Sequence, residues 1–439
     1  MKQILVPIFL FTTLLASAQI DVGGIVKRKA EQRVQQKIEQ GVDKAFDETE
    51  EGIKESAKGD KDKDKNKDEE GQSDAKNDSK TATEAPAKDS KKSLSTYSKF
   101  DFVPGEKVMV EDHFAQVAVG DYPVDWNTNS GGEIVQVDGK DGKWLQITKE
   151  GVHLPDYFTD LPDNFTLQWD VIVNEEFSFY SGALDVTFLS TQNRQKLNDF
   201  TKYSHPAHAL RLGMHPTDAG GGKGTVSIEN WDASGARVID NTVSNSKFHS
   251  KTSNFVHVSV WRQKQRLRVY FNDEKVLDIP RAFDGSVKYN AISFGYGGGG
   301  NTEDKYLLGN IRLAVGAPDT RSKLVTEGKL VTRGILFDKG SDKIKPESYG
   351  TLKDIAGVLT EYADIKVTII GHTDSDGDDA SNLELSKKRA AAVKDALSKE
   401  FAIDASRMET DGKGETQPSD KNYTEVGKAN NRRVEFVKR

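Results

Sequence analysis

The sequence predicts three parts: a disordered N-terminal segment, an all-β sandwich, and a small α+β domain. Three observations carry this. Residues 59–95 are charged and poor in apolar side chains, all five tryptophans lie within 98–318, and residues 325–439 alternate strand with helix patterns. Only 35% of the 439 residues are hydrophobic, against about 45–50% in ordinary globular chains. Part of the chain is therefore expected not to fold.

The first segment has the pattern of a cleaved secretory signal peptide. Met1-Lys2-Gln3 precedes an apolar run from Ile4 to Ala16, which ends in Ala16-Ser17-Ala18. The run is shorter than the roughly 20 residues that span a membrane, and small residues mark a cleavage site. We expect residues 1–18 to be removed and the mature chain to be exported without a transmembrane helix.

Residues 19–97 are expected to be a charged, low-complexity linker. One aromatic residue, Phe46, occurs between Gln19 and Ser95, and Asp60 to Glu70 reads DKDKDKNKDEE. Such composition buries too little apolar surface to offset chain entropy. Apolar residues recur every four positions from Val26 to Phe46, which predicts a weak helix over 25–57. A helix docked on a specific partner remains an alternative.

Residues 98–318 are predicted to form the β-sandwich. Apolar and polar residues alternate over 165–171 and 255–261, and Gly and Asp-Gly turns recur between such runs. Alternation with regular turn signals is typical of antiparallel sheets. The order of features resembles the concanavalin/laminin-G-like jelly roll, a lectin-type fold. The matching features are Asp112-His-Phe114, Tyr122-Pro-x-x-Trp126, the strand pair ending at Ile279, Ile292-Ser-Phe-Gly295 and Asn310–Val315. This resemblance implies glycan binding, glycan cleavage or a spacer role.

Several alternatives remain for the sandwich. Glycan hydrolysis needs two closely placed carboxylates, and Glu229-Asn-Trp-Asp232 has the wrong spacing for the laminarinase-type pattern. An outer-membrane β-barrel is a structural rival. His205, His208 and His215 suggest either a zinc site or ordinary loop residues. The tryptophans suit either a core or an exposed platform on which sugars stack.

The C-terminal segment, 325–439, is expected to contain strands at 330–337, 365–370 and 432–437 and helices at 346–361 and 382–399. On a wheel of roughly 100° per residue, Asn382 and Arg389 fall inside the apolar arc of the second helix. A buried guanidinium needs an anion or a set of carbonyls, and Asp374, just past the central strand, is the best candidate for a carboxylate partner. The pair predicts either a structural ion pair or a site for an amino-acid zwitterion.

These residues belong to a set of motifs. The chain has Gly371-His372-Thr373-Asp374, Asn382-Leu-Glu-Leu-Ser-Lys-Lys-Arg389-Ala390 and Asn431-Arg432-Arg433-Val434, after an earlier Phe337-Asp338. Together they resemble the OmpA-like C-terminal domain, a peptidoglycan-binding module of Gram-negative envelopes. The resemblance implies that Asp374 and Arg389 clasp diaminopimelate of the peptide stem. It also implies that Asn382, Thr373 and Phe337-Asp338 line the pocket, with Arg433 behind it. Lys413 departs from the family, which often has an aromatic residue there.

We therefore expect a non-enzymatic protein of the periplasm, associated with peptidoglycan and the outer membrane. The sandwich would face a glycan or an outer-membrane protein. The chain has no cysteine, which excludes thiolate chemistry and a lipidated N-terminal Cys, and its net charge of −7 argues against nucleic-acid binding. No cofactor or metal is expected. A wall-tethered polysaccharide hydrolase, a barrel with a periplasmic anchor and a plain spacer remain alternatives.

Overall fold

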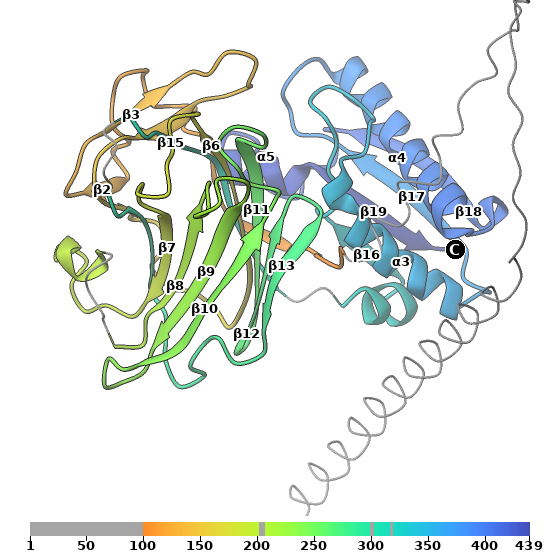
Figure 1. Ribbon diagram of the computed structural model, residues 1–439. Helices are drawn as coiled ribbons and strands as arrows, with labels where there is room; N and C mark the ends of the chain where they lie inside the picture. The colour runs from red at the N-terminus through yellow and green to blue at the C-terminus, as the bar shows by residue number, and fades with distance from the viewer. Residues whose placement is uncertain (1–99, 202–206, 299–302, 317–318) are drawn as a thin grey trace, which may run out of the picture. The chain divides into compact units, whose positions relative to one another are not determined.

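The computed structural model describes residues 100–201, 207–298, 303–316 and 319–439, which belong to one compact unit (Figure 1). The predicted signal peptide, the linker and its weak helix lie outside the described residues. Among the described helices, none combines the length and apolar character needed to cross a membrane.

The first sheet has eight antiparallel strands. Its order is β13-β12-β11-β6-β15-β4-β3, and β1 pairs with β15. The strands are β1 (Lys107–Asp112), β3 (Gly132–Val135), β4 (Trp144–Ile147), β6 (Asn164–Val173), β11 (Phe255–Gln263), β12 (Arg266–Phe271), β13 (Glu274–Ile279) and β15 (Tyr306–Val315).

The second sheet has seven strands in the order β10-β9-β8-β7-β14-β5-β2, again all antiparallel. The strands are β2 (Trp126–Thr128), β5 (Gly151–Pro155), β7 (Leu184–Leu189), β8 (Leu210–His215), β9 (Gly224–Trp231), β10 (Arg237–Asn245) and β14 (Ala291–Tyr296). A short 3₁₀ turn, η1 (Leu197–Phe200), follows β7. A sandwich-like pair of sheets therefore forms, as expected; the finer lectin-type assignment stays a prediction.

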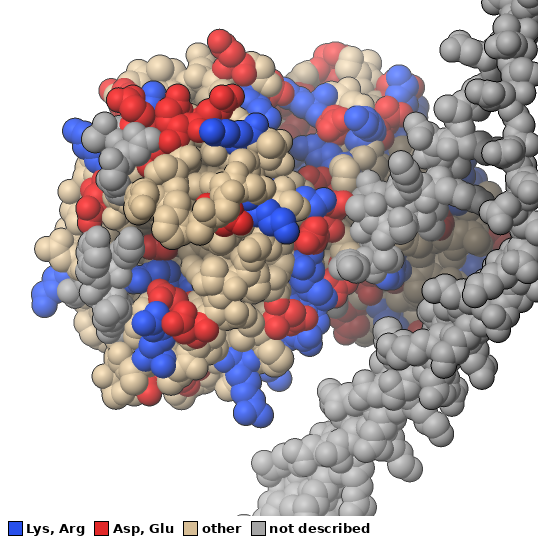
Figure 2. Space-filling model, viewed as in Figure 1, with Lys and Arg blue, Asp and Glu red and all other residues tan. Residues whose placement is uncertain are grey.

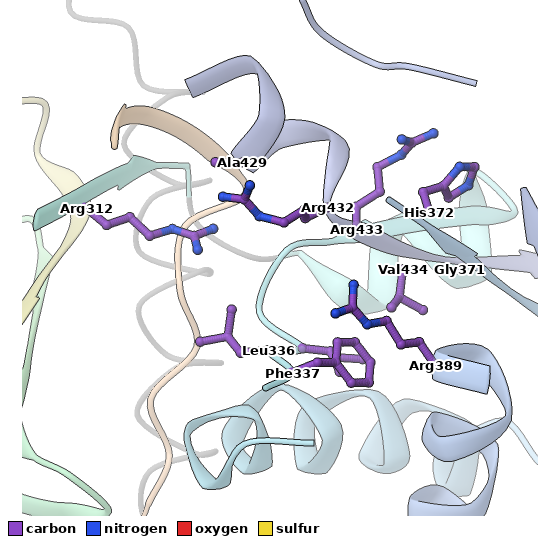
Figure 3. Close-up of a pocket in the computed structure, with 11 residues that line it drawn as sticks. Arg312, Leu336, Phe337, Gly371, His372, Arg389, Ala429, Arg432, Arg433 and Val434 are labelled. Atoms are coloured by element: carbon purple, nitrogen blue, oxygen red, sulfur yellow. The ribbon is translucent and has the colours of Figure 1, made fainter. Parts of the chain in front are cut away.

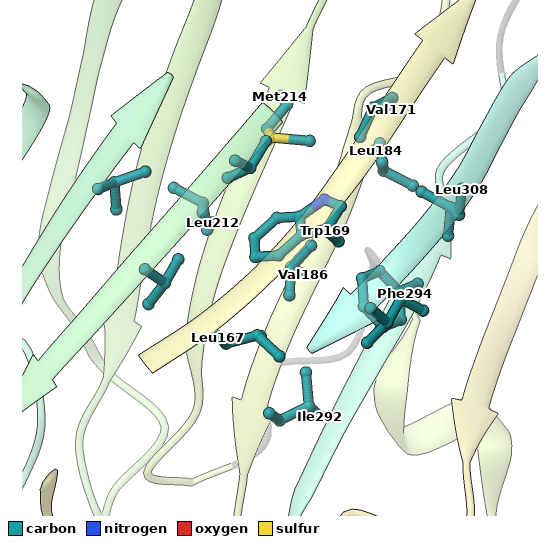
Figure 4. Packing of buried hydrophobic residues seen from close by; sticks show 14 of the residues in the cluster. Leu167, Trp169, Val171, Leu184, Val186, Leu212, Met214, Ile292, Phe294 and Leu308 are labelled. Atoms are coloured by element: carbon teal, nitrogen blue, oxygen red, sulfur yellow. The ribbon is translucent and has the colours of Figure 1, made fainter. Parts of the chain in front are cut away.

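The core lies between the two sheets (Figure 4). Leu167, Trp169 and Val171 alternate along β6 and meet Leu212 of β8 and Phe294 of β14. Successive side chains of a strand point to opposite faces, so the alternation seen in the sequence becomes one buried row. Full burial of each such side chain contributes about 2–3 kcal/mol.

Of the two alternatives for the tryptophans, the core is confirmed and the exposed platform is wrong. The exposed fractions of the five tryptophans are all 8% or less. Trp126 and Trp169 belong to the main core, whereas Trp144, Trp231 and Trp261 fill smaller apolar clusters on other faces of the sheets. Because these faces are also covered, position in an alternating strand could not distinguish an exposed ring from a buried one.

The C-terminal part is a four-stranded sheet in the order β16-β19-β17-β18, in which only β17 and β18 run parallel. Its helices α3 and α4 share one apolar core with the sheet. The elements are η2 (Ser322–Thr326), β16 (Lys329–Thr332), η3 (Pro346–Ser348), α3 (Tyr349–Glu361), β17 (Val367–His372), α4 (Asp379–Phe401), η4 (Ala405–Arg407), β18 (Met408–Gly414), α5 (Glu425–Asn431) and β19 (Arg433–Lys438).

Helix α4 is longer than the sequence pattern predicted, because its ends are set by caps. The Asp378 carboxylate accepts a hydrogen bond from the Ser381 backbone N–H at 3.0 Å, which satisfies one free donor of the first turn. The predicted strand 330–337 was too long: β16 ends at Thr332, and Phe337 forms only an isolated bridge with Ile344. Strand β18 and helix α5 were not predicted.

Helix α5 joins the C-terminal sheet to the sandwich. The Asn430 side chain accepts a hydrogen bond from the Val108 N–H and donates one to the Val108 carbonyl, both at 3.1 Å. A second contact is aromatic: Phe100 and Phe102 pack with Trp261 and Tyr270 of the sandwich and with Tyr349 of α3. The two folded parts therefore share hydrogen bonds as well as apolar packing.

Candidate functional site

Asp374 follows the central strand β17 and is 8% exposed. Its Oδ1 accepts a hydrogen bond from the Asp376 N–H at 3.2 Å. Its Oδ2 accepts one from Arg432 Nη1 at 2.6 Å, within an ion pair. The sequence had proposed Arg389 as the partner of Asp374, but the structure gives that position to Arg432.

Arg389 of α4 lies across the site, half-buried over the Phe337 ring at 4.9 Å from its centroid. Its Nε donates to the Ser341 carbonyl at 2.9 Å, and Nη2 donates to the Asp338 carbonyl at 3.5 Å. Burial lowers the pKa of Arg389, and the nearby Asp374 carboxylate works in the opposite direction. The guanidinium is held by neutral carbonyls, so its charge remains available to an anion.

Close packing of α4 against the sheet sets the position of Arg389. A Cβ on Gly371 would meet the Ser386 carbonyl oxygen at 2.2 Å, and one on Gly412 would meet Ser386 Oγ at 2.4 Å. Only glycine permits such an approach of backbone to backbone. The glycines of the turn motif and of β18 are therefore needed to bring the helix arginine beside the strand end.

A cavity of about 90 Å³ opens beside Arg389. Figure 3 shows Arg389 and Phe337 on one side, and Arg312 and Arg432 reaching it from the direction of β15 and α5. Arg433 and His372 also line it. Four arginines around so small a space favour an anion, and a planar guanidinium can bind a carboxylate through two parallel hydrogen bonds.

Asn382 and Thr373 hold the loop around Asp374. The Asn382 amide donates to the carbonyls of Asp374 and Asp376 at 3.3 and 3.2 Å, and to Glu415 Oε2 at 2.6 Å. The Thr373 N–H donates to the Gly414 carbonyl at 3.0 Å. Among the described residues, the buried Thr373 hydroxyl has no hydrogen-bond partner.

The remaining predicted residues have distinct places. Phe337 supplies the ring under Arg389, and Asp338 offers its backbone carbonyl while its carboxylate lies 3.5 Å from Lys343. Arg433 is buried: Nε donates to Glu435 at 2.8 Å and Nη2 to the Gln417 carbonyl at 3.0 Å. These contacts give Arg433 a supporting role behind the pocket.

Sequence reasoning missed Arg432, Arg312 and Glu111. Arg432 stood within the quoted Asn-Arg-Arg-Val motif, and its side-chain direction was the missing information. Arg312 of β15 and Glu111 of β1 are opposite each other in the sandwich ladder. No signal in the sequence connects them with residues of the C-terminal domain.

The histidines suspected of binding zinc do not converge in the described part of the chain. His208 Nδ1 lies 3.2 Å from Asp284, and His215 Nε2 lies 2.8 Å from the Ser181 carbonyl. His205 lies outside the described residues. Within the residues described, no cluster of three or more His, Asp and Glu side chains has the geometry of a metal site.

Together, the fold and the site define the C-terminal part as a small α+β domain with a cavity lined by arginine side chains. Residues 336–432 match the model of the OmpA family, and this segment is an OmpA-family domain.

The segment is similar to two curated relatives. It is 40% identical over 111 residues to outer membrane porin F of Pseudomonas aeruginosa, covering 25% of this chain and 32% of that protein. It is 45% identical over 103 residues to the probable lipoprotein YiaD of Escherichia coli, covering 24% and 47%. The chain thus spans less than half the length of these relatives.

Among solved structures, the segment is similar to the peptidoglycan-associated lipoprotein of Burkholderia pseudomallei. The identity is 30%, the match covers 24% of this chain and 88% of the other, and the TM-score is 0.23.

Proposed function

We propose that the C-terminal domain binds peptidoglycan non-covalently through the diaminopimelate of its peptide stem. The observation that carries the proposal is the placement of an acidic side chain, Asp374, beside a cavity lined by Arg389 and three further arginines. A free amino-acid end presents one ammonium and one carboxylate. The Asp374 carboxylate is suited to the ammonium, and the Arg389 guanidinium, which is held only by backbone carbonyls, to the carboxylate.

The chemistry is recognition without a reaction. Each charge-assisted hydrogen bond to the stem contributes about 1.5–3 kcal/mol. We propose that the chain is not an enzyme, since the pocket combines one carboxylate with arginines rather than a nucleophile and a base.

We also propose a location. The similar proteins are named as an outer membrane porin and a lipoprotein. By analogy, this chain would be exported to the periplasm and held at the envelope by its wall contact. The mixed acidic and basic side chains on the face in Figure 2 are consistent with a partner that is not nucleic acid.

A sedimentation assay with diaminopimelate-type sacculi tests the proposal. Asp374→Asn and Arg389→Ala should each weaken binding at least tenfold, which is what losing about 1.5–3 kcal/mol means. Asp364→Asn and Lys388→Ala are matched controls, because both residues are exposed on the same domain, and both should bind normally. Equal sedimentation of wild type and the two site variants would end the proposal.

The identity of the stem residue is tested with a second wall. Lysine lacks the side-chain carboxylate of diaminopimelate, so lysine-type sacculi offer no zwitterionic end. We expect them to bind at least tenfold more weakly, because the charge-assisted hydrogen bond to the missing carboxylate is lost. Equal affinity for both walls would show that Arg389 does not recognise that carboxylate.

For the sandwich we propose a second, weaker contact with a glycan. Among the described residues, its exposed aromatic side chains are Phe179 and Tyr180, which are 57% and 78% exposed. The centroids of their rings are 5.5 Å apart. Rings of this kind stack on sugars. Sacculi stripped of stems by an amidase should retain weak binding that Phe179→Ser/Tyr180→Ser abolishes. If stripped sacculi bind neither the wild type nor the double variant, the sandwich is better described as a spacer.

A further inference from the structure

Arg432 lies between two carboxylates that belong to different folded parts. Its Nη1 donates to Asp374 Oδ2 at 2.6 Å, and its Nη2 lies 3.6 Å from Glu111 Oε1. Asp374 belongs to the proposed wall site, whereas Glu111 is on strand β1 of the sandwich. The sandwich therefore reaches the binding site through one arginine.

The pairing with Asp374 conflicts with the proposed ligand. The ammonium of a stem needs the negative charge of Asp374, and Arg432 already neutralises that charge. Asp374 Oδ1 is also engaged by the Asp376 N–H. Two cations on one carboxylate repel each other, so an arriving ammonium must compete with Arg432.

Glu111 is a suitable second partner for the displaced arginine. Its side chain is 6% exposed. Burial opposes its ionisation, but Arg312, His113 and Arg432 more than offset this and lower its pKa. Its Oε1 lies 3.0 Å from His113 Nε2 and 3.6 Å from Arg432 Nη2, and its Oε2 lies 3.6 Å from Arg312 Nε. The Arg432 contact is longer than a hydrogen bond, so Arg432 can approach Oε1 more closely and add a charge-assisted hydrogen bond to this buried carboxylate.

We propose that Arg432 exchanges from Asp374 to Glu111 when a stem binds, so that the sandwich sets the availability of the wall site. This rests on the peptidoglycan binding proposed above. The exchange requires only a rotation of the Arg432 side chain, which already contacts both carboxylates and is 36% exposed.

A double-mutant cycle on the full chain tests the exchange. The probe is a soluble muropeptide that carries diaminopimelate, titrated by calorimetry. Glu111→Gln should weaken affinity about fivefold, since a coupling of this kind is typically worth about 5-fold or more. Arg432→Gln should strengthen affinity severalfold, because Asp374 is then free. In the Arg432→Gln background, Glu111→Gln should have no further effect.

Glu106→Gln is the matched control. Glu106 immediately precedes β1 and pairs with Lys323, so its loss perturbs the same region without touching Arg432. It should bind like wild type.

Three results would overturn the exchange. Glu111→Gln could bind like wild type, or it could weaken binding equally in both backgrounds, which would indicate damage to the fold. Arg432→Gln could weaken binding, which would make Arg432 a direct ligand contact. Asp374→Asn in the same titration separates the two proposals: if it binds normally, the wall site itself is wrong, whatever the cycle shows.

Discussion

The contact between Asn430 and Val108 allows a quantitative prediction. Asn430 is 2% exposed, and its amide bonds both the N–H and the carbonyl of Val108, which is fully buried. Asn430→Ala removes both partners at once. It also removes the bond that the same amide donates to Asp420 at 3.0 Å.

The expected cost follows from the groups left without partners. Each buried backbone group without a hydrogen bond costs about 1–3 kcal/mol, so two groups cost about 3 kcal/mol when water enters part of the space. Urea lowers the free energy of unfolding by about 3 kcal/mol per M for a domain of this size. The midpoint of the urea transition should therefore fall by about 1 M.

Equilibrium unfolding, followed by tryptophan fluorescence and by circular dichroism, measures this shift. All five tryptophans lie in the sandwich, so fluorescence reports the sandwich alone, while circular dichroism also reports α3 and α4. If the contact couples the two parts, both signals shift together. A midpoint within about 0.2 M of wild type, well below that 1 M, would refute the reasoning.

Three further predictions concern burial and packing. Burial lowers the pKa of His153 from 6.5 to about 4, so its neutral form stabilises the fold above pH 6.5 and this contribution is lost as the pH falls towards 4. The loss in the free energy of unfolding is about 3 kcal/mol. His153→Gln should therefore flatten the dependence of that free energy on pH below 6.5, as measured by denaturant unfolding at a series of pH values. An unchanged dependence would contradict the role of His153. Gly371→Ala should lower both the melting temperature and sacculus binding, because a Cβ would meet the Ser386 carbonyl at 2.2 Å; a variant that binds normally would show that α4 can move. Trp169→Ala should cost about 3–5 kcal/mol in denaturant unfolding, and a loss under about 1 kcal/mol would mean that the core refills the space.

The order of elements was largely predictable from the sequence, because hydrophobic periodicity depends on local spacing. Helix α4 and strand β17 were expected close to their observed bounds, whereas β18 was missed. Its burial alternates weakly and its sequence, METDGKG, carries two glycines and little apolar content. Pairing with β17 compensates for that poor propensity, and such tertiary pairing leaves no local pattern.

The site was predictable only in part: Phe337, Arg389 and Arg433 were named as site residues from the sequence and line the cavity, whereas Arg312 and Arg432 also line it and were not so named. Arg389 was recognised as a polar residue on an apolar arc, and Asp374 as a loop carboxylate after a central strand. The partner of Asp374 could not be deduced, because Arg432 and Arg433 are adjacent in the motif, and only the structure shows that Arg432 caps the end of α5 whereas Arg433 begins β19. The contribution of Glu111 depends on how the sandwich docks, which is a three-dimensional property.

The position of β1 has a mechanical consequence. Strand β1 pairs with β15 along one edge, and Val108 is also held by Asn430 of the C-terminal domain. Tension applied to the chain ahead of residue 100 would load Phe100 and Phe102 first, then β1. At Val108 that load divides between the sandwich ladder and the C-terminal domain. Force applied on the N-terminal side would thus reach the C-terminal domain without passing through the whole sandwich.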